Sequence, residues 1–172
     1  MRHLGILTTI LLMVTAGAAS AQSERDAVLK TVDRFLLSLS SRDSALVSEV
    51  LAPEGRFFSI TDQGDSTIFR NSTFADYLAG QRRETRNLKE RIWDAEVLIH
   101  GGVAVVWAKY DFHINGSFSH CGVDAFTLGK GNTGWIITGV TYTVEATGCV
   151  ASPLGPPLSD SEPLMRRPSS SE

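Results

Sequence analysis

The sequence lacks an excess of positive charge, a membrane-length apolar segment and the short motifs of several enzyme classes. With 16 Lys and Arg against 19 Asp and Glu, no nucleic acid partner is expected. No segment reaches the roughly 20 apolar residues of a spanning helix, so no membrane insertion is expected. Nucleophile elbows, phosphate-binding loops and zinc-type ligand spacings are also missing. We therefore expect no cofactor and no metal.

The N-terminus has the pattern of an export signal. Arg2 and His3 precede an apolar run from Leu4 to Val14, and small residues follow up to Ala21. Residues 1–21 are therefore predicted to be a signal peptide, which makes the protein secreted or periplasmic. Residues 22–149 are predicted to form one domain, because this length is enough for a single hydrophobic core and too short for two ordinary domains. Residues 150–172 are rich in Pro and Ser and are predicted to be a disordered tail.

Helical periodicity occupies the first part of the predicted domain. A capping Ser23 precedes inward positions at helical spacing, namely Val28, Val32, Phe35, Leu36 and Leu39. A second helix should begin near Asp43 and stop before Pro53. Strands over residues 56–60 and 66–70 should follow. Ser72 is then expected to cap a third helix that ends near Gly80.

From residue 89 onward the sequence favours strands. Four β-rich segments cover residues 90–100, 103–114, 118–128 and 135–144, and Gly-containing turns separate them. This pattern predicts an α+β domain with a curved antiparallel sheet and three N-terminal helices on its concave face.

The segment 118–128 carries the most informative pattern for a site. Alternate side chains of a strand share a face, so His120 and Asp124 should lie together with Phe118, Phe126 and Leu128. Between the segments 103–114 and 118–128, a three-residue loop ending at Gly116 is favoured over a two-residue turn. Only the register set by that loop gives the sheet one face of aromatic residues and another of mixed polar and apolar residues. The favoured register pairs Phe112 with Phe118, Tyr110 with His120 and Val106 with Asp124.

The sequence resembles the nuclear transport factor 2-like superfamily, which has a cystatin-like fold. The resemblance rests on the order of these elements and on two short motifs, Gly134-Trp-Ile136 and Val123-Asp-Ala-Phe126. Members of this superfamily include SnoaL-like polyketide cyclases and ketosteroid isomerases. The run from Ser119 to Asp124 and the terminal Gly148-Cys149 look closest to exported lumazine-binding-like members. The resemblance spans about residues 24–149. It implies a conical cavity, whereas function has to be argued from the site itself.

The isomerase pattern is only partly present. That pattern uses a helix tyrosine, a strand acid and a strand aspartate base, and the matching positions are Phe35, Asp124 and about Ser59. Steroid-type isomerisation is therefore not expected, because two of the three groups are absent.

Two functions remain open from the residues. In the favoured one, a hydrophobic conical pocket binds a small planar organic molecule. Its lining is predicted to be Phe35, Tyr110, Phe112, Phe118, His120, Asp124, Phe126, Thr141 and Thr143. The alternative is a lyase, cyclase or isomerase in which His120 and Asp124 perform acid–base chemistry in the same pocket.

Two features of the exported part concern assembly and covalent chemistry. The convex sheet face should be apolar and uncovered by any helix, which predicts a homodimer with Trp107 near its centre. Its predicted members are Val105, Trp107, Cys121, Val123, Ala125, Ile136, Val140 and Tyr142. A disulfide between Cys121 and Cys149 is chemically allowed and is left open. Glycosylation of Asn71 or Asn115 depends on the host.

Overall fold

The structure is a computed structural model that describes residues 4–157, with side chains from residue 19 onward. Within these residues the chain forms three helices and one six-stranded sheet. In chain order the elements are α1 (Leu4–Ser41), α2 (Ser44–Val50), β1 (Leu51–Asp62), β2 (Thr67–Thr73), α3 (Phe74–Gln81), β3 (Leu88–His100), β4 (Val103–Ile114), β5 (Ser117–Gly131) and β6 (Gly134–Thr143).

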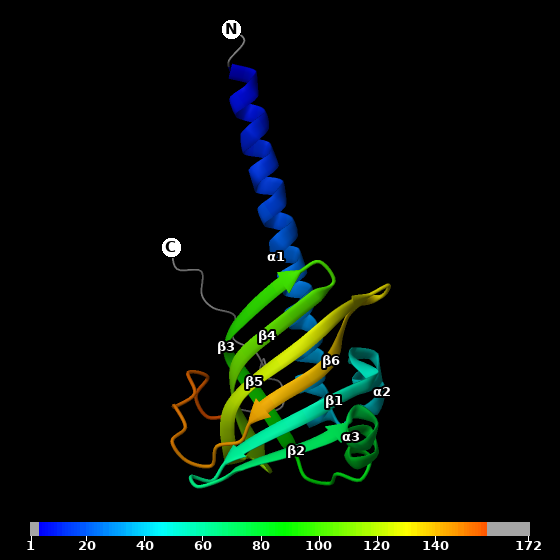
Figure 1. Cartoon of the computed structure of the whole chain (residues 1–172), viewed down its shortest axis with the longest axis vertical. Helices are drawn as coiled ribbons and strands as arrows, with labels where there is room; N and C mark the ends of the chain where they lie inside the picture. The colour runs from blue at the N-terminus through cyan, green and yellow to red at the C-terminus, as the bar shows by residue number, and fades with distance from the viewer. Residues whose placement is uncertain (1–3, 158–172) are drawn as a thin grey trace.

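Helix α1 lies along one side of the sheet, and its N-terminal part projects beyond it (Figure 1). The predicted inward positions of α1 are buried, with Val28, Val32 and Leu36 fully enclosed. The expected start at Ser23 is wrong, because the helix already begins at Leu4. Residues 4–22 contain no proline and many good helix formers, so nothing interrupts the helix there. No helix of the described residues is long and apolar enough to cross a membrane.

The two short helices begin at side-chain caps. The Asp43 carboxylate accepts hydrogen bonds from the backbone N–H groups of Ala45 and Leu46, at 2.9 and 3.1 Å, as the sequence predicts. Helix α3 is capped by Thr73, one residue after the expected Ser72. Thr73 and Asp76 form a reciprocal capping box there.

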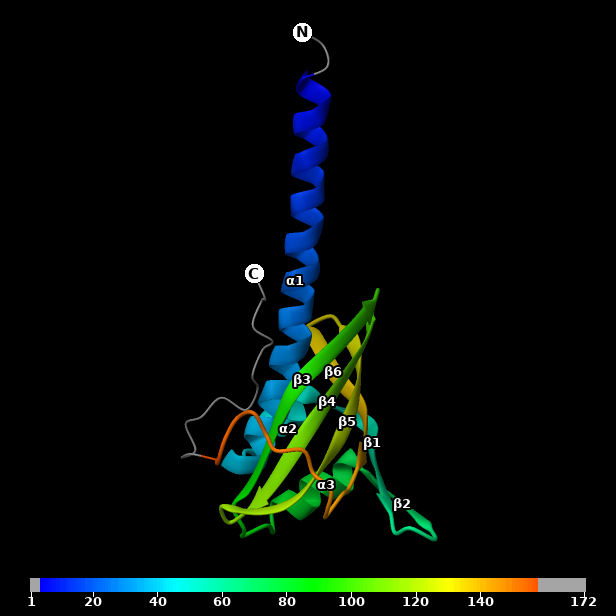
Figure 2. The same ribbon diagram turned by 90° about the vertical axis from the view of Figure 1, so that its left-hand side faces the viewer.

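The sheet has the strand order β2-β1-β6-β5-β4-β3, and only the β1–β6 pair is parallel. All three helices lie on one side of this curved sheet (Figure 2). The α+β architecture expected from the sequence is confirmed. The first two strands are longer than predicted, and they extend the four-stranded meander to six strands.

Three β-bulges in the antiparallel part of the sheet determine which side chains reach the concave face. They lie at Asp94 in β3, at Ser119 in β5 and at Thr138 in β6, where the pairing registers shift. Each extra residue moves the following side chains of its strand to the opposite face. The alternation read directly from the sequence therefore fails beyond each bulge.

The predicted β4–β5 register is wrong. The hairpin closes with a two-residue turn at Asn115-Gly116, whose φ values are 53° and 79°, as Asn-Gly favours. The bulge at Ser119 then shifts the pairing again. The observed pairs include Phe112 with His120, Tyr110 with Gly122, Ala108 with Asp124 and Val106 with Phe126.

The segment after β6 returns to the convex face, where a disulfide joins Cys121 to Cys149. Their Cα atoms are 5.9 Å apart. Backbone hydrogen bonds of 3.0 and 2.9 Å also link Cys121 with Glu145. This segment, orange in Figure 1, covers part of the face that was expected to be open. Residues 151–157 have no helix or strand, and the rest of the predicted tail lies outside the described residues.

Candidate functional site

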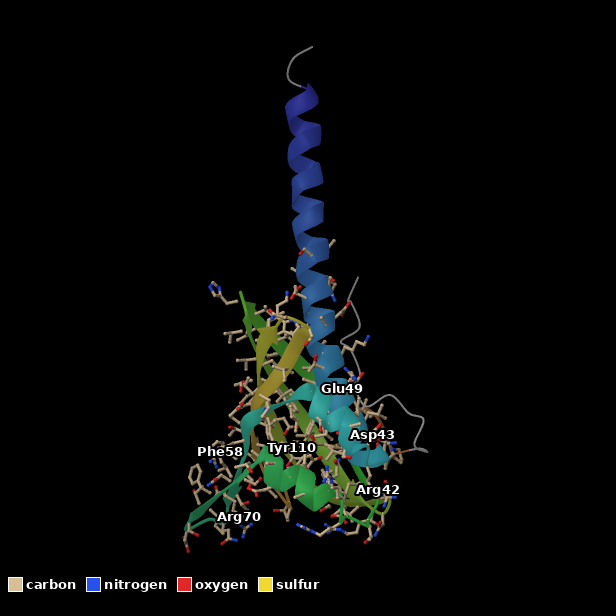
Figure 3. All side chains as sticks on the ribbon, turned by 90° about the vertical axis from the view of Figure 1, so that its right-hand side faces the viewer. Arg42, Asp43, Glu49, Phe58, Arg70 and Tyr110 are labelled. Atoms are coloured by element: carbon tan, nitrogen blue, oxygen red, sulfur yellow. A yellow bond between two sulfur atoms is a disulfide. The ribbon has the colours of Figure 1, made fainter. Side chains whose placement is uncertain are left out.

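A cavity of about 230 Å³ lies between the concave face of the sheet and the helices. Tyr110 is seen inside the molecule in Figure 3, whereas Phe58 and Arg70 lie on its outer side. All six strands and helices α1 and α3 contribute to the lining. The lining residues are Phe35, Leu39, Phe57, Ser72, Tyr77, Leu88, Glu90, Tyr110, Phe112, His120, Asp124, Val140 and Tyr142.

Cross-strand pairing positions the polar groups of the cavity. Glu90 pairs with Phe112, which pairs with His120, so these three side chains form one row across the sheet. Asp124 pairs with Ala108 on one side and Tyr142 on the other. The sheet thus brings polar groups from three strands to one concave surface.

Because Gly122 has no side chain, the ring of Tyr110 can pass over β5 at this position. A Cβ atom at position 122 would lie 2.4 Å from the backbone oxygen of Thr143 and 2.8 Å from Cε1 of Tyr110. The Tyr110 hydroxyl donates a hydrogen bond of 2.6 Å to that same Thr143 oxygen. Burial raises the pKa of Tyr110, and the nearby Glu90 charge raises it further. Tyr110 is therefore a fixed, neutral wall of the cavity.

His120 is held between aromatic rings. It stacks on Phe112 with ring centroids 4.9 Å apart, and it meets the Tyr110 ring edge-on at 5.7 Å. Its Nδ1 atom lies 3.0 Å from the Ser119 hydroxyl. Burial lowers the pKa of His120, so the imidazole is neutral at neutral pH. A neutral imidazole can accept a proton.

Two carboxyl groups, Glu90 and Asp124, interact inside the cavity. Burial raises the pKa of Glu90 to about 7. Burial also raises the pKa of Asp124 well above its usual range, and the Glu90 charge and hydrogen bond add to this. The interaction favours the ionised form of Glu90 and the protonated form of Asp124. At neutral pH Asp124 is therefore a carboxylic acid, whereas Glu90, with a pKa of about 7, is ionised in only part of the molecules.

One oxygen of the Asp124 carboxyl has no partner. The Asp124 side chain is only 3% exposed. Its Oδ2 atom is buried and makes no hydrogen bond with any residue the structure describes. A buried polar atom without a partner carries a desolvation cost of about 1–3 kcal/mol. Asp124 also lines the cavity, so a ligand that reaches its carboxyl group can supply the missing donor.

Five of the predicted site residues line the cavity together, namely Phe35, Tyr110, Phe112, His120 and Asp124. Phe126 lies on the concave face but is fully buried in the core, with its ring 6.1 Å from that of Phe35.

Three predicted positions are wrong, because β-bulges reverse the faces. Phe118 precedes the bulge at Ser119; it is half exposed and contacts His113 of the opposite face, at 5.8 Å. Thr141 and Thr143 follow the bulge at Thr138, so Val140 and Tyr142 take the concave positions instead. The same reversal removes Val140 and Tyr142 from the convex patch.

Glu90, Tyr77 and Tyr142 line the cavity but are not among the lining residues predicted from the sequence. Glu90 alternates with Leu88 and Ile92 at the start of β3, and this period of two was the signal that could have placed it inward. Tyr77 lies on α3, where its contact with the sheet depends on tertiary packing. Among the described residues, no group of three or more His, Cys, Asp or Glu side chains could hold a metal ion.

Comparisons with known proteins support the fold. No family model and no curated protein matches the sequence. A nuclear transport factor 2-like protein of cystatin-like fold from Novosphingobium aromaticivorans is similar, with TM-score 0.60, 16% identity and coverage of 77% of this chain and 89% of that one. A nuclear transport factor 2-like superfamily protein from Salmonella enterica serovar Typhimurium has TM-score 0.57, 19% identity and coverages of 76% and 96%.

A third similar structure is the β subunit assigned to an aromatic-ring-hydroxylating dioxygenase of N. aromaticivorans. Its TM-score is 0.61 at 15% identity, and the match covers 81% of this chain and 99% of that one. The chain therefore has the nuclear transport factor 2-like, or cystatin-like, fold. At these identities the likeness concerns the fold alone.

Proposed function

We propose that this protein is an exported domain that binds a small planar organic molecule in the concave cavity. The observation that carries the proposal is an aromatic cavity lined by Asp124, a residue whose Oδ2 atom is buried and unpartnered. Mostly apolar linings with a few polar anchors are the usual design of small-molecule sites. A filled core would leave no such space.

The cavity volume limits the ligand to one or two rings. An apolar cavity of about 150 Å³ holds benzene, and drug-sized ligands occupy about 300–1,000 Å³. The cavity here, about 230 Å³, lies between these values. Flat rings also match the walls formed by Phe35, Phe57 and Phe112.

Export is supported by two independent features. The first 21 residues have the pattern of a signal peptide. The disulfide between Cys121 and Cys149 is of a kind that persists in oxidising compartments such as the periplasm or the extracellular space.

Filling the cavity tests the binding function. Val140 lines the cavity, so Val140→Phe should place a ring in the ligand space. Val150→Phe is the matched control, because Val150 is 69% exposed outside this cavity. Calorimetric titration with a panel of one- and two-ring aromatic compounds should show binding to the wild type and to the control, but not to Val140→Phe. A panel that binds all three proteins equally would refute the proposed site.

Acid–base catalysis is the second candidate, and one observation favours it. Burial lowers the pKa of His120 and raises that of Asp124, so a base and an acid face one cavity at neutral pH. They lie roughly 13 Å apart by strand rise and would act at opposite ends of one substrate. Asp124→Asn should then abolish turnover of dehydratase, cyclase or isomerase substrates while the fold persists. Wild type without turnover on such a screen would leave binding as the function.

A homodimer through the convex sheet face is the proposed assembly. Leu98, Val103 and Trp107 are 71%, 61% and 52% exposed on β3 and β4. Exposed apolar clusters on one face usually mark an interface. The remaining part of the face near Cys121 is covered by the segment after β6, so the proposed interface is limited to the uncovered end.

A further inference from the structure

The charges that face the cavity are all acidic or neutral. The described lining contains Glu90 and Asp124 but no Lys or Arg. Arg91 and Lys89 alternate with Glu90 along β3 and therefore lie on the other face, where Arg91 binds Asp111. No basic side chain of the lining balances the Glu90 charge. A buried anion needs a counter-charge, and only a proton or a ligand is left to supply it.

The cavity walls suit a positive charge. Six aromatic rings face it: Phe35, Phe57, Tyr77, Tyr110, Phe112 and Tyr142. The faces of such rings attract cations by about 0.5–2 kcal/mol, more when water is excluded. The tyrosine hydroxyls add oxygen atoms around Glu90, whose charge acts on all three of them.

The two carboxyls also present complementary acceptors. Both carboxyl groups line the cavity, and the Oδ2 atom of Asp124 is buried without a hydrogen-bond partner among the described residues, so it can accept a hydrogen bond. The Glu90 carboxylate accepts as well. A group with two or more N–H donors and a positive charge would satisfy both, as planar bidentate cations do with carboxylates.

We propose that the cavity takes a planar organic cation of one or two rings, an amidinium, guanidinium or ring-bearing ammonium, whose N–H groups bind Glu90 and Asp124. This inference rests on the proposed function and names its ligand class. The cation replaces the proton on Glu90 as counter-charge, and the aromatic rings enclose its flat surface.

The proposal implies a proton linkage. Around Glu90 the titratable groups are Tyr77 from α3, Tyr110 and Asp111 from β4, His120 and Asp124 from β5, and Tyr142 from β6. Helix α1 and strand β1 contribute only Phe35, Leu39 and Phe57. Below about pH 7 the free protein holds a proton on Glu90, and a bound cation expels it. Cation affinity should therefore rise about tenfold per pH unit up to about pH 7 and then level off.

Benzamidinium and benzamide form a matched probe pair, because they have the same shape and differ in charge. Calorimetric titration from about pH 5.5 to about pH 8.5 should show benzamidinium binding at least tenfold more tightly than benzamide at the upper end. Glu90→Gln should remove most of that preference. Glu96→Gln, an exposed position on the same strand, should keep it. Titration in buffers of different ionisation enthalpy should show proton release at low pH.

The outcomes separate this inference from the proposed function. If benzamide and other neutral planar probes bind as tightly as benzamidinium at every pH, the cation claim is refuted and the binding function stands. If neither benzamidinium nor any neutral planar probe binds, both fail. A benzamidinium preference that survives Glu90→Gln unchanged would also overturn the inference, because Glu90 would then not be its counter-charge.

Discussion

Replacing Glu90 by Gln should stabilise the protein above neutral pH. In the folded state burial raises the pKa of Glu90 from 4.5 to about 7. A carboxyl with a raised folded-state pKa binds more protons folded than unfolded, so stability falls as pH rises from about 4.5 to about 7 and stays lower above that. Gln has nearly the same shape and no charge, and it removes this cost.

The magnitude follows from the pKa difference. Each pKa unit corresponds to about 1.4 kcal/mol, so the rise from 4.5 to about 7 costs about 3 kcal/mol. Because Glu90 is partly exposed to the cavity, solvent screening reduces this to about 2 kcal/mol. For a domain of this size, that gain raises the melting temperature by roughly 4–8 °C.

Urea unfolding followed by tryptophan fluorescence measures the effect at about pH 5 and about pH 8. Glu90→Gln should be more stable than wild type at the higher pH and nearly equal at the lower one. Glu96→Gln, exposed on the same strand, should show no such pH-dependent difference. A Glu90→Gln protein that equals wild type at about pH 8, or that is destabilised equally at both values, would refute the buried-carboxylate account.

Three further variants test the fold and the assembly. Gly122→Ala should destabilise the protein by roughly 3 kcal/mol in urea unfolding, since the added methyl group would lie 2.4 Å from a backbone oxygen. Gly129→Ala should be tolerated better, because the nearest atom to its added methyl group is 3.6 Å away. Equal effects of the two variants would contradict the close approach at Gly122. Replacing Cys121 and Cys149 by Ser should cost about 3–4 kcal/mol, because their bond spans 28 residues, and unchanged thermal unfolding would refute it. Trp107→Glu should dissociate the proposed dimer in sedimentation; a wild-type monomer at tens of micromolar would refute the dimer.

The fold could be predicted largely from the sequence, because its signals are local. The inward positions of α1, the Asp43 cap and the four strand segments after residue 89 depend on periodicity and capping alone. The predicted start of α1 at Ser23 was wrong, because no residue that ends a helix precedes Ser23. The parallel β1–β6 pair joins distant strands and leaves no local signal.

The site could be predicted only in part, because β-bulges interrupt the alternation. His120 and Asp124 lie on the same side of the bulge at Ser119, so the period of two places them on one face. Phe118 precedes the bulge at Ser119 and Thr141 follows the bulge at Thr138, so both are misplaced by simple alternation. Neither bulge has a residue signature as clear as Asn-Gly. The partnership of Glu90 with Asp124 could not be predicted, since it requires the register of three strands at once.

Native mass spectrometry of the protein purified from its own host tests the cavity most directly. The wild type should carry a small organic molecule of one defined mass, and Val140→Phe purified in parallel should not. The same molecule should remain with Val150→Phe, which leaves the cavity open. Wild-type protein free of any ligand, or a ligand retained equally by Val140→Phe, would contradict the claim that this cavity is the binding site.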